Sequence, residues 1–273
     1  YNEFWASRDY LNQMGPMKAA LLMSHGFNDW NVMPEHSYRI YSKAREMGLP
    51  SQIYYHQGGH GGPPPISMMN RWFTRYLFEI ENGVENDPKA WIVREGESRS
   101  EPTAYADFPN PTAEPVVLYL KKGGNDAGTL STIKSSKKKE SLVDNVNYTG
   151  EYLARIKSSD HRLLYTSPTL KSDLHLSGIT ELSIRLASSK PAANLSVWLV
   201  SLPWEDAEHG EIYNNIITRG WADPQNSSSL TESKPLEPGT FYNLRFDLQP
   251  DDQIIRAGQR LGLMIFSSDQ EFT

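Results

Sequence analysis

The feature that most constrains this chain is a change in hydrophobic pattern near residue 86. Before that point, amphipathic stretches with helical spacing alternate with short apolar runs typical of buried parallel strands. After it, apolar and polar residues alternate at every second position in several short segments, which Pro, Gly, Asn and Ser separate. The sequence therefore predicts an α/β region over residues 1–85 and an all-β region over residues 86–273.

In the first region the segments follow the order helix, strand, helix, strand, helix. Pro34 suits the first position of the second helix, and Gly48 with Pro50 ends it. Strands joined through a helix pair in parallel, so we expect a parallel sheet covered by helices. The predicted helices cover residues 3–14, 34–47 and 67–81, and the predicted strands cover residues 18–24 and 51–56.

In the second region the alternation has a period of two residues. Leu182, Ile184 and Leu186 point to one side of their segment, while the residues between them are polar. Short strands of this kind, bounded by turn residues, predict an antiparallel β-sandwich. The same pattern recurs over residues 195–199, 242–248 and 261–265.

The composition limits the partners that the chain can have. Its 273 residues carry a net charge of −6 with an isoelectric point near 5.7, which argues against nucleic acid as a ligand. The absence of Cys excludes a disulfide scaffold, a thiolate zinc site and a Cys nucleophile. No apolar run approaches the roughly 20 residues that span a bilayer, so no membrane partner is expected.

The first candidate for chemistry is Asp29, which lies just past the predicted end of the first strand at Ser24. Catalytic groups of parallel α/β sheets gather beyond the carboxyl ends of the strands. A carboxylate there can hold an imidazole in one tautomer and stabilise the imidazolium. The alternative is that Asp29 caps a turn or the following helix, as many loop Asp residues do.

The second candidate is His60, which follows the second strand and has two Gly residues on each side. Glycines allow unusual backbone dihedrals and leave room for a partner to approach. An Asp and then a His after consecutive strands is the order of α/β-hydrolases, in which the nucleophilic Ser comes first. We therefore predict that Asp29 and His60 lie within hydrogen-bonding distance.

The sequence holds no G-x-S-x-G nucleophile motif. The nearest match, residues 96–100, lacks the second Gly and leads into Pro102. A His-Gly oxyanion loop at His25 would also require such a motif after it. His56 and His60 are four residues apart, but the Gly residues between them disfavour a helix, so no metal site is predicted. The chain begins at Tyr1 without an initiator Met, and we expect a longer protein with the Ser upstream.

Residues 24–32 (SHGFNDWNV) and 56–60 (HQGGH) resemble the bacterial X-prolyl dipeptidyl-peptidases. They resemble more loosely the wider group that holds cocaine esterase and acylases of the glutaryl-cephalosporin kind. Residues 218–221 stand where that family tends to have a basic residue followed by Gly. Residues 235–242, 257–261 and 267–269 look like its C-terminal jelly-roll domain.

The resemblance implies the C-terminal part of an α/β-hydrolase catalytic domain over residues 1–85. A galactose-binding-like jelly-roll β-sandwich would follow over residues 86–273. It implies that Asp29 and His60 are the acid and base of a Ser-Asp-His triad.

The implied activity is a serine-type dipeptidyl aminopeptidase that releases X-Pro dipeptides from peptide N-termini, without a cofactor. Its partner would be a peptide with proline at the second position, and a homo-oligomer stays open. Trp30, Asn31 and Val32 follow the acid and should lie near the acyl pocket. Trp30 and Val32 would suit a proline ring, and Asn31 could bond a substrate carbonyl; ordinary helix entry and packing are their alternative role.

Two other functions stay open on the sequence. The first is an esterase or amide acylase of the cocaine-esterase type on the same scaffold. The second is a non-catalytic jelly roll that binds carbohydrate or docks a partner, which would need exposed aromatic side chains on the sandwich. The candidates for such a surface are Trp198, Trp204, Tyr213, Trp221, Phe241 and Tyr242.

Overall fold

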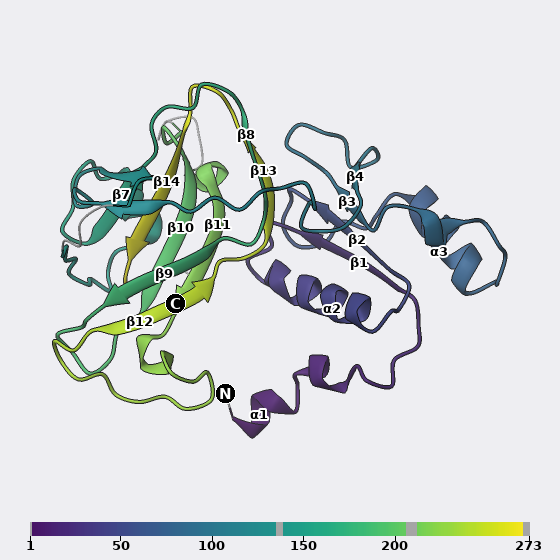
Figure 1. Ribbon diagram of the computed structural model, residues 1–273, viewed down its shortest axis with the longest axis horizontal. Helices are drawn as coiled ribbons and strands as arrows, with labels where there is room; N and C mark the ends of the chain where they lie inside the picture. Colours follow the sequence, from purple (N-terminus) through teal and green to yellow (C-terminus); the bar gives the residue numbers. More distant parts are fainter. Residues whose placement is uncertain (1, 135–138, 206–211, 270–273) are drawn as a thin grey trace. The chain divides into compact units, whose positions relative to one another are not determined.

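A computed structural model of the protein describes residues 2–134, 139–205 and 212–269 (Figure 1). Contacts between Cα atoms divide the chain into two compact units. The first unit holds residues up to 113 together with 176–179 and 249–254, and the second unit holds the rest. Each unit has its own sheet and its own buried apolar cluster.

The first unit contains a four-stranded sheet in the order β1-β2-β3-β4. β1 pairs in parallel with β2, and β2 pairs in parallel with β3, which confirms the predicted parallel sheet; β4 is antiparallel to β3. Helix α2 connects β1 to β2 and runs along this strand pair in Figure 1. The bounds are β1 Leu21–Gly26, α2 Pro34–Glu46, β2 Ser51–His56, β3 Ala90–Ile92 and β4 Thr103–Tyr105.

The apolar stripe of α2 packs against the sheet. Tyr41 and Ala44 are buried on this helix, and Tyr41 joins a cluster with Phe27, Ile53 and Tyr55. Every residue of β2 is buried, as expected for a central strand of a covered parallel sheet. The rings of Phe27 and Tyr55 stack with centroids 4.4 Å apart, which fixes the chain just after β1 against β2.

The prediction of one helix over residues 3–14 is wrong. The segment forms helix α1 (Glu3–Ala6) and a separate 3₁₀ turn η1 (Tyr10–Gln13), because the Asp9 side chain accepts from Leu11 N and starts a new turn. The apolar residues that suggested a helix are exposed in the described structure: Phe4 by 54%, Trp5 by 58% and Tyr10 by 69%. Short helices without a packed face are marginal in water.

The third predicted helix is present but shorter than expected. Helix α3 (Ile66–Tyr76) ends five residues before the predicted end at residue 81. Trp72 is buried on it, whereas the nearby apolar residues Phe73 and Leu77 are 45% and 69% exposed. A 3₁₀ turn, η2 (Val84–Asn86), follows after Gly83 in the left-handed conformation.

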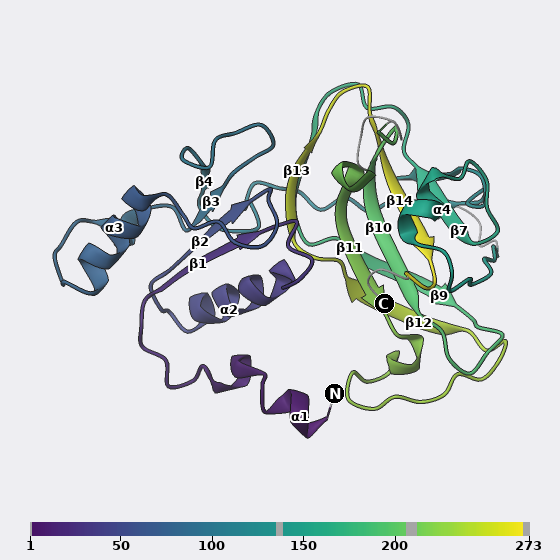
Figure 2. The ribbon, with the colours of Figure 1, turned by 180° about the vertical axis from the view of Figure 1, so that it is seen from behind.

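The second unit contains a six-stranded sheet in the order β11-β10-β14-β7-β6-β5, whose strands β11, β10 and β14 lie side by side in Figure 2. Its neighbours pair antiparallel, except that β6 and β7 are parallel. The sheet is therefore mixed, unlike the purely antiparallel pattern predicted from alternation. The bounds are β5 Tyr119–Lys121, β6 Gly128–Ser131, β7 Arg162–Thr166, β10 Leu195–Leu202, β11 Ile216–Ala222 and β14 Arg260–Phe266.

Two further strand pairs are β9 with β12 and β8 with β13. Along β9 and β12, polar residues are exposed and the apolar residues between them are buried or half-buried, as the alternation predicted. The pairing aligns Ile184 with Leu244, and Arg245 forms an exposed ion pair with Glu181 at 2.6 Å. The bounds are β8 Leu174–Gly178, β9 Glu181–Leu186, β12 Tyr242–Asp247 and β13 Asp251–Ile255; short 3₁₀ turns are η3 Ile212–Asn215 and η4 Pro224–Asn226.

Strand β10 is buried at all eight positions, so both of its faces are covered. Helix α4 (Gly150–Arg155) contributes Leu153 and Ala154 to a cluster with Trp198 and Phe266. The two rings meet edge to face with centroids 5.2 Å apart. Alternation therefore identified β10 as a strand but did not indicate that its second face is also core.

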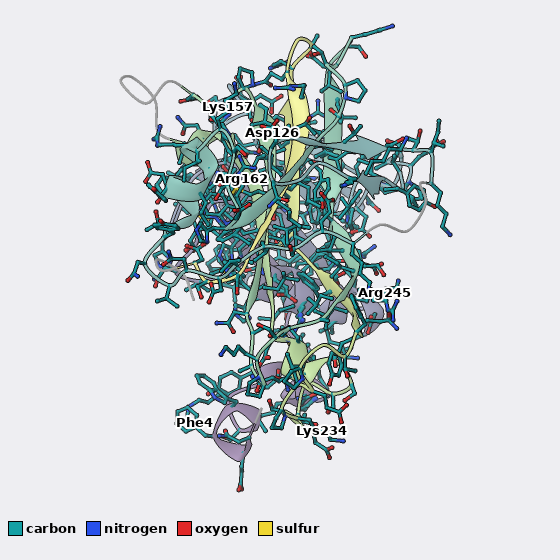
Figure 3. The ribbon with its side chains drawn as sticks, turned by 90° about the vertical axis from the view of Figure 1, so that its left-hand side faces the viewer. Phe4, Asp126, Lys157, Arg162, Lys234 and Arg245 are labelled. Atoms are coloured by element: carbon teal, nitrogen blue, oxygen red, sulfur yellow. The ribbon has the colours of Figure 1, made fainter. Side chains whose placement is uncertain are left out.

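A buried arginine ties α4 to the neighbouring turn. Arg162 is 1% exposed, and Figure 3 shows it near Asp126 and Lys157. Its guanidinium donates to the carbonyl oxygens of Leu153, Gly124, Asp126, Ile156 and Lys157 at 2.6–3.3 Å. A cation that donates to the last carbonyls of a helix also interacts favourably with the helix dipole.

The predicted domain boundary between residues 85 and 86 stays a prediction. Strand β3 pairs with β2 through Ala90 and Ile53, so the first sheet continues beyond residue 85. Spatial contacts put the first break after Ala113, whereas the predicted boundary follows the change in sequence pattern. Among the helices of the described ranges, none is long and apolar enough to cross a membrane.

The packing of α4 predicts a stability change at Gly150. A Cβ there would lie 2.2 Å from Trp198 Cζ2, so Gly150→Ala should lower the free energy of unfolding by about 1–3 kcal/mol. Urea denaturation followed by circular dichroism measures the change, with Gly15→Ala as control because nothing lies within 4 Å of its Cβ. Equal or higher stability of Gly150→Ala would contradict this packing, since Ala otherwise favours a helix.

Candidate functional site

The loops after β1 and β2 are joined by hydrogen bonds at the carboxyl ends of these strands. Phe27 N donates to His56 O at 2.8 Å, and Asn28 N donates to Gly58 O at 3.2 Å. The Asn28 side chain donates to Gln57 O at 2.8 Å. β1 extends through Gly26, two residues beyond the predicted end, so the segment that carries Asp29 starts directly from the sheet.

Gly26 permits the close approach of the two loops. A Cβ at this position would lie 2.1 Å from Gly58 O and 2.5 Å from Gly59 O, closer than real Cβ contacts occur. The Ser24 hydroxyl then donates to Gly62 O at 2.8 Å and holds the far end of the loop. The segment that carries His60 is therefore attached to β1 on both sides of the imidazole.

Asp29 and His60 are in contact, as predicted. Asp29 Oδ2 lies 2.9 Å from His60 Nδ1, and Asp29 is only 3% exposed. The other oxygen, Oδ1, accepts from Asn31 N at 3.1 Å and from Val32 N at 3.0 Å. The carboxylate thus also stabilises its own turn, so the turn role considered as an alternative is present together with the contact to His60. It is not the N-cap of α2, which is Met33.

Hydrogen bonding keeps Asp29 ionised. Burial alone would raise the pKa of its carboxyl, but the hydrogen bonds from Val32 N, His60 and Asn31 N outweigh burial, and the pKa lies below the ordinary value. An ionised carboxylate only accepts, so His60 Nδ1 carries the proton in this contact and Nε2 of the neutral ring is a base. The His60 side chain is 66% exposed, so a partner can reach the ring.

A second imidazole contacts the same carboxylate. His25 Nε2 lies 3.1 Å from Asp29 Oδ2 and 2.8 Å from Val32 O, and its Nδ1 lies 2.6 Å from Ser37 Oγ. Sequence reasoning considered His25 as part of an oxyanion loop, and it missed Ser37. The four-residue spacing of His25 and Asp29 could have suggested their contact. The predicted strand ended too early, at Ser24, and therefore placed His25 in a loop.

Ser37, His25 and Asp29 have the connectivity of a catalytic triad, but not its accessibility. Ser37 is 5% exposed and lies in the first turn of α2, so a substrate carbonyl cannot approach its hydroxyl. Its partner ring has a side chain that is 9% exposed. Ser37 therefore acts as a structural hydrogen-bonding group rather than as the nucleophile of this site.

His56 is enclosed beneath the loop that carries His60. It is fully buried, and its Nδ1 accepts from Gly58 N at 3.0 Å. Burial, and then the positive charge of Arg99, lower its pKa, so the ring is neutral at neutral pH. Gly62 has φ of +107°, and a Cβ there would lie 2.6 Å from His56 Nε2. Gly62 therefore leaves the space that the buried His56 ring occupies, which is one reason for a glycine beside His60.

The three residues predicted to lie near the acyl pocket have different positions. Val32 is 40% exposed and lines a recess at the site. Trp30 is half-buried and Asn31 is exposed, and neither lines this recess. Their roles in substrate binding stay predictions. The recess is lined by Ser24, His25, Gly26, Asp29, Val32, His60, Gly61, Gly62 and Pro63.

The aromatic residues considered for a docking surface do not form an exposed platform. Trp198 is 1% exposed, and Trp204 and Tyr213 pack against its cluster. The remaining three, Trp221, Phe241 and Tyr242, are all half-buried. The Phe241 ring is covered by the cations of Lys139 and Arg185 at 4.6 and 4.7 Å.

The close approach at Gly26 predicts that Gly26→Ala separates Asp29 from His60, because the new Cβ must push the carbonyls of Gly58 and Gly59 away. The low-field proton resonance of His60 Nδ1 should be lost or exchange faster with water in this variant. Gly59→Ala is the control, since its Cβ would meet Asn28 O at an ordinary 3.5 Å. An unchanged resonance in Gly26→Ala would contradict the rigid attachment of the loop.

Comparisons with known proteins are consistent along the whole chain. Residues 1–62 match the X-Pro dipeptidyl-peptidase (S15) family, and residues 82–273 match the X-Pro dipeptidyl-peptidase C-terminal non-catalytic domain. A putative Xaa-Pro dipeptidyl-peptidase of Rhodopirellula baltica is 57% identical over the full chain, and one of Bacillus anthracis is 33% identical. The chain covers only 44% and 45% of these two relatives, so it spans less than half their length.

Solved structures share the fold at low sequence identity. An aminopeptidase from a marine sediment archaeon has a TM-score of 0.77 at 17% identity, covering 98% of this chain and 51% of that one. An α-amino acid ester hydrolase has a TM-score of 0.75 at 15% identity, covering 98% and 51%. A CocE/NonD family hydrolase from Staphylococcus aureus has a TM-score of 0.75 at 18% identity, covering 97% and 49%. The fold is that of α/β-hydrolases of this kind, and the chain belongs to the X-Pro dipeptidyl-peptidase family.

Proposed function

We propose that this chain supplies the acid and the base of a Ser-Asp-His triad in a serine-type dipeptidyl aminopeptidase. The observation that carries the proposal is the 2.9 Å contact between buried Asp29 Oδ2 and accessible His60 Nδ1. The contact lies at the carboxyl ends of parallel strands, where such groups act in α/β folds. It also falls in residues 1–62, which match the peptidase family.

In the proposed reaction, His60 Nε2 takes the proton from the Ser hydroxyl as Oγ attacks the carbonyl carbon of the prolyl residue. His60 then gives that proton to the departing amine nitrogen as the C–N bond breaks. A water next attacks the acyl ester; His60 takes its proton and returns it to Ser Oγ, which releases the dipeptide. Asp29 keeps the proton on Nδ1 throughout and stabilises the imidazolium.

The nucleophile belongs, in this proposal, to a part of the protein outside residues 1–273. No G-x-S-x-G motif occurs in the sequence, and the curated relatives are more than twice as long as this chain. Removing a triad nucleophile lowers kcat by about 10⁶-fold. The chain by itself should therefore show no turnover.

The proposed substrate is a peptide with proline at its second position. Val32 lines the recess beside Asp29 and His60 and offers apolar surface to a proline ring. We extend this role to Trp30 as a second apolar group and to Asn31 as a donor to a substrate carbonyl. The relatives' names support this class: Rhodopirellula baltica, Bacillus anthracis and Lactobacillus delbrueckii subsp. lactis each have a protein named as an Xaa-Pro dipeptidyl-peptidase, putative in the first two.

An esterase or amide acylase is the second candidate. The structural similarity to an α-amino acid ester hydrolase, with a TM-score of 0.75, favours it because that fold carries ester chemistry. An ester has a better leaving group than an amide, so it demands less of His60 as an acid. The two candidates share the triad and differ in substrate.

For residues 86–273, apart from β3 and β4 of the first sheet, we propose a jelly-roll β-sandwich. Its support is the six-stranded sheet together with the additional strand pairs β9–β12 and β8–β13. A docking or sugar-binding role has little support, because none of the six candidate aromatic residues is exposed. The sequence match to a non-catalytic domain over residues 82–273 agrees with a structural role.

Substrate preference tests the proposal in the full-length protein. Ala-Pro-p-nitroanilide should have a much higher kcat/KM than p-nitrophenyl butyrate. N-acetylation of the peptide should nearly abolish cleavage, because an aminopeptidase must bind a free N-terminus. The measurement is kcat/KM for all three substrates on one preparation, with the isolated 273-residue chain as an inactive control.

Two results would count against the proposal. If the ester is preferred by orders of magnitude and acetylation has no effect, the protein is an esterase or acylase. If the isolated chain hydrolyses a substrate in a His60-dependent way, the nucleophile lies within it.

A further inference from the structure

His25 takes no part in the proposed reaction, yet it contacts the carboxylate of Asp29. Its side chain is 9% exposed, and both ring nitrogens are hydrogen-bonded. Nε2 faces Asp29 Oδ2 and Val32 O, and Nδ1 faces Ser37 Oγ. We propose that His25, held by Ser37, is a positioning residue that fixes the Asp29 carboxylate for its contact with His60.

The hydrogen bonds define which nitrogen of His25 carries a proton. The carbonyl oxygen of Val32 can only accept, so Nε2 at 2.8 Å must be the donor. The same Nε2–H points between Val32 O and Asp29 Oδ2 at 3.1 Å. In the neutral ring, Nδ1 then accepts from the Ser37 hydroxyl at 2.6 Å. Val32 O thus fixes the tautomer that donates toward Asp29, and Ser37 satisfies the other ring nitrogen.

The two imidazoles approach one and the same oxygen. Asp29 Oδ2 receives His60 Nδ1–H at 2.9 Å and His25 Nε2–H at 3.1 Å, while Oδ1 is occupied by the N–H groups of Asn31 and Val32. Each oxygen therefore has two donors, and rotation of the carboxylate would lose bonds on both. Of the two described donors to Oδ2, His25 lies on β1 and His60 lies on an exposed loop.

The donor from His25 also changes how strongly Asp29 attracts a protonated His60. A hydrogen bond into Oδ2 withdraws charge from the carboxylate and so reduces its pull on the imidazolium. Without His25, Asp29 should hold the imidazolium more strongly but in a less defined orientation. The expected consequences are a lower kcat and an acid limb of kcat/KM that moves to higher pH.

The titratable groups around His25 come from three elements. Asp29 and His60 lie on the loops after β1 and β2, and His60 contacts the same Asp29 oxygen as His25 does. From β2, the Tyr55 ring lies with its centroid 6.5 Å from the His25 ring, and buried His56 ends the same strand. From α2, only the neutral hydroxyl of Ser37 has a hydrogen bond to His25 among the described contacts.

The inference rests on the proposed function and is tested in the full-length enzyme with Ala-Pro-p-nitroanilide. His25→Leu should lower kcat about 10- to 100-fold with KM near the wild-type value, and shift the acid limb of kcat/KM to higher pH. His25→Gln keeps an amide donor near the place of Nε2 and should recover much of the loss. Ser37→Ala should lower kcat by a smaller factor and shift the acid limb of kcat/KM in the same direction. His36→Leu, an exposed neighbour of Ser37, is the matched control.

The outcomes separate this inference from the proposed function. If Asp29→Asn is inactive while His25→Leu and Ser37→Ala keep the wild-type kcat and acid limb, the inference alone fails. If His25→Leu does not fold, Ser37→Ala decides by the same two readouts. If the wild type cleaves no substrate, the proposed function fails. The low-field His60 Nδ1 resonance then still tests whether His25 positions Asp29. That resonance should exchange faster in His25→Leu, and an unchanged signal would overturn the positioning role.

Discussion

Asp29 is almost fully buried, and its carboxylate accepts hydrogen bonds from two backbone N–H groups and from two imidazoles. A buried charge is tolerated only when such donors replace the lost water. Here the donors outweigh burial and lower the pKa, so the group stays ionised at neutral pH. Because the donors come from the turn after β1, from the loop of His60 and from β1 itself, the carboxylate also fixes that turn, the tautomer of His60 and the orientation of His25.

The rest of the first unit serves to bring these donors together. Parallel pairing of β1 with β2 places both loops at one edge of the sheet, and Gly26 allows the carbonyls of the His60 loop to contact β1. The completely buried β2 and the stacked rings of Phe27 and Tyr55 give the two loops a rigid base. Precise placement on rigid strands is what an acid–base pair needs, since small displacements cost large factors in rate.

Much of this arrangement could be predicted from the sequence, and the failures have physical causes. The contact between Asp29 and His60 was predictable because carboxyl ends of adjacent parallel strands meet at one edge. The pairing of His25 with Ser37 was not, because it depends on where β1 ends and on how α2 is rotated against the sheet, and tertiary packing sets both. The single helix over residues 3–14 was wrong because its apolar residues have no buried face in the described structure. The second face of β10 was missed because alternation reveals only one buried side.

The central claim is that Asp29 and His60 act as one catalytic unit, and a double-variant comparison of kcat in the full-length protein tests it most directly. The four proteins are the wild type, Asp29→Asn, His60→Gln and the variant with both changes. Groups that act together give strongly non-additive losses. We expect Asp29→Asn alone to lower kcat by about 10⁴-fold, and the double variant to be no slower than His60→Gln. Losses that multiply, or an Asp29→Asn protein with wild-type kcat, would contradict the claim.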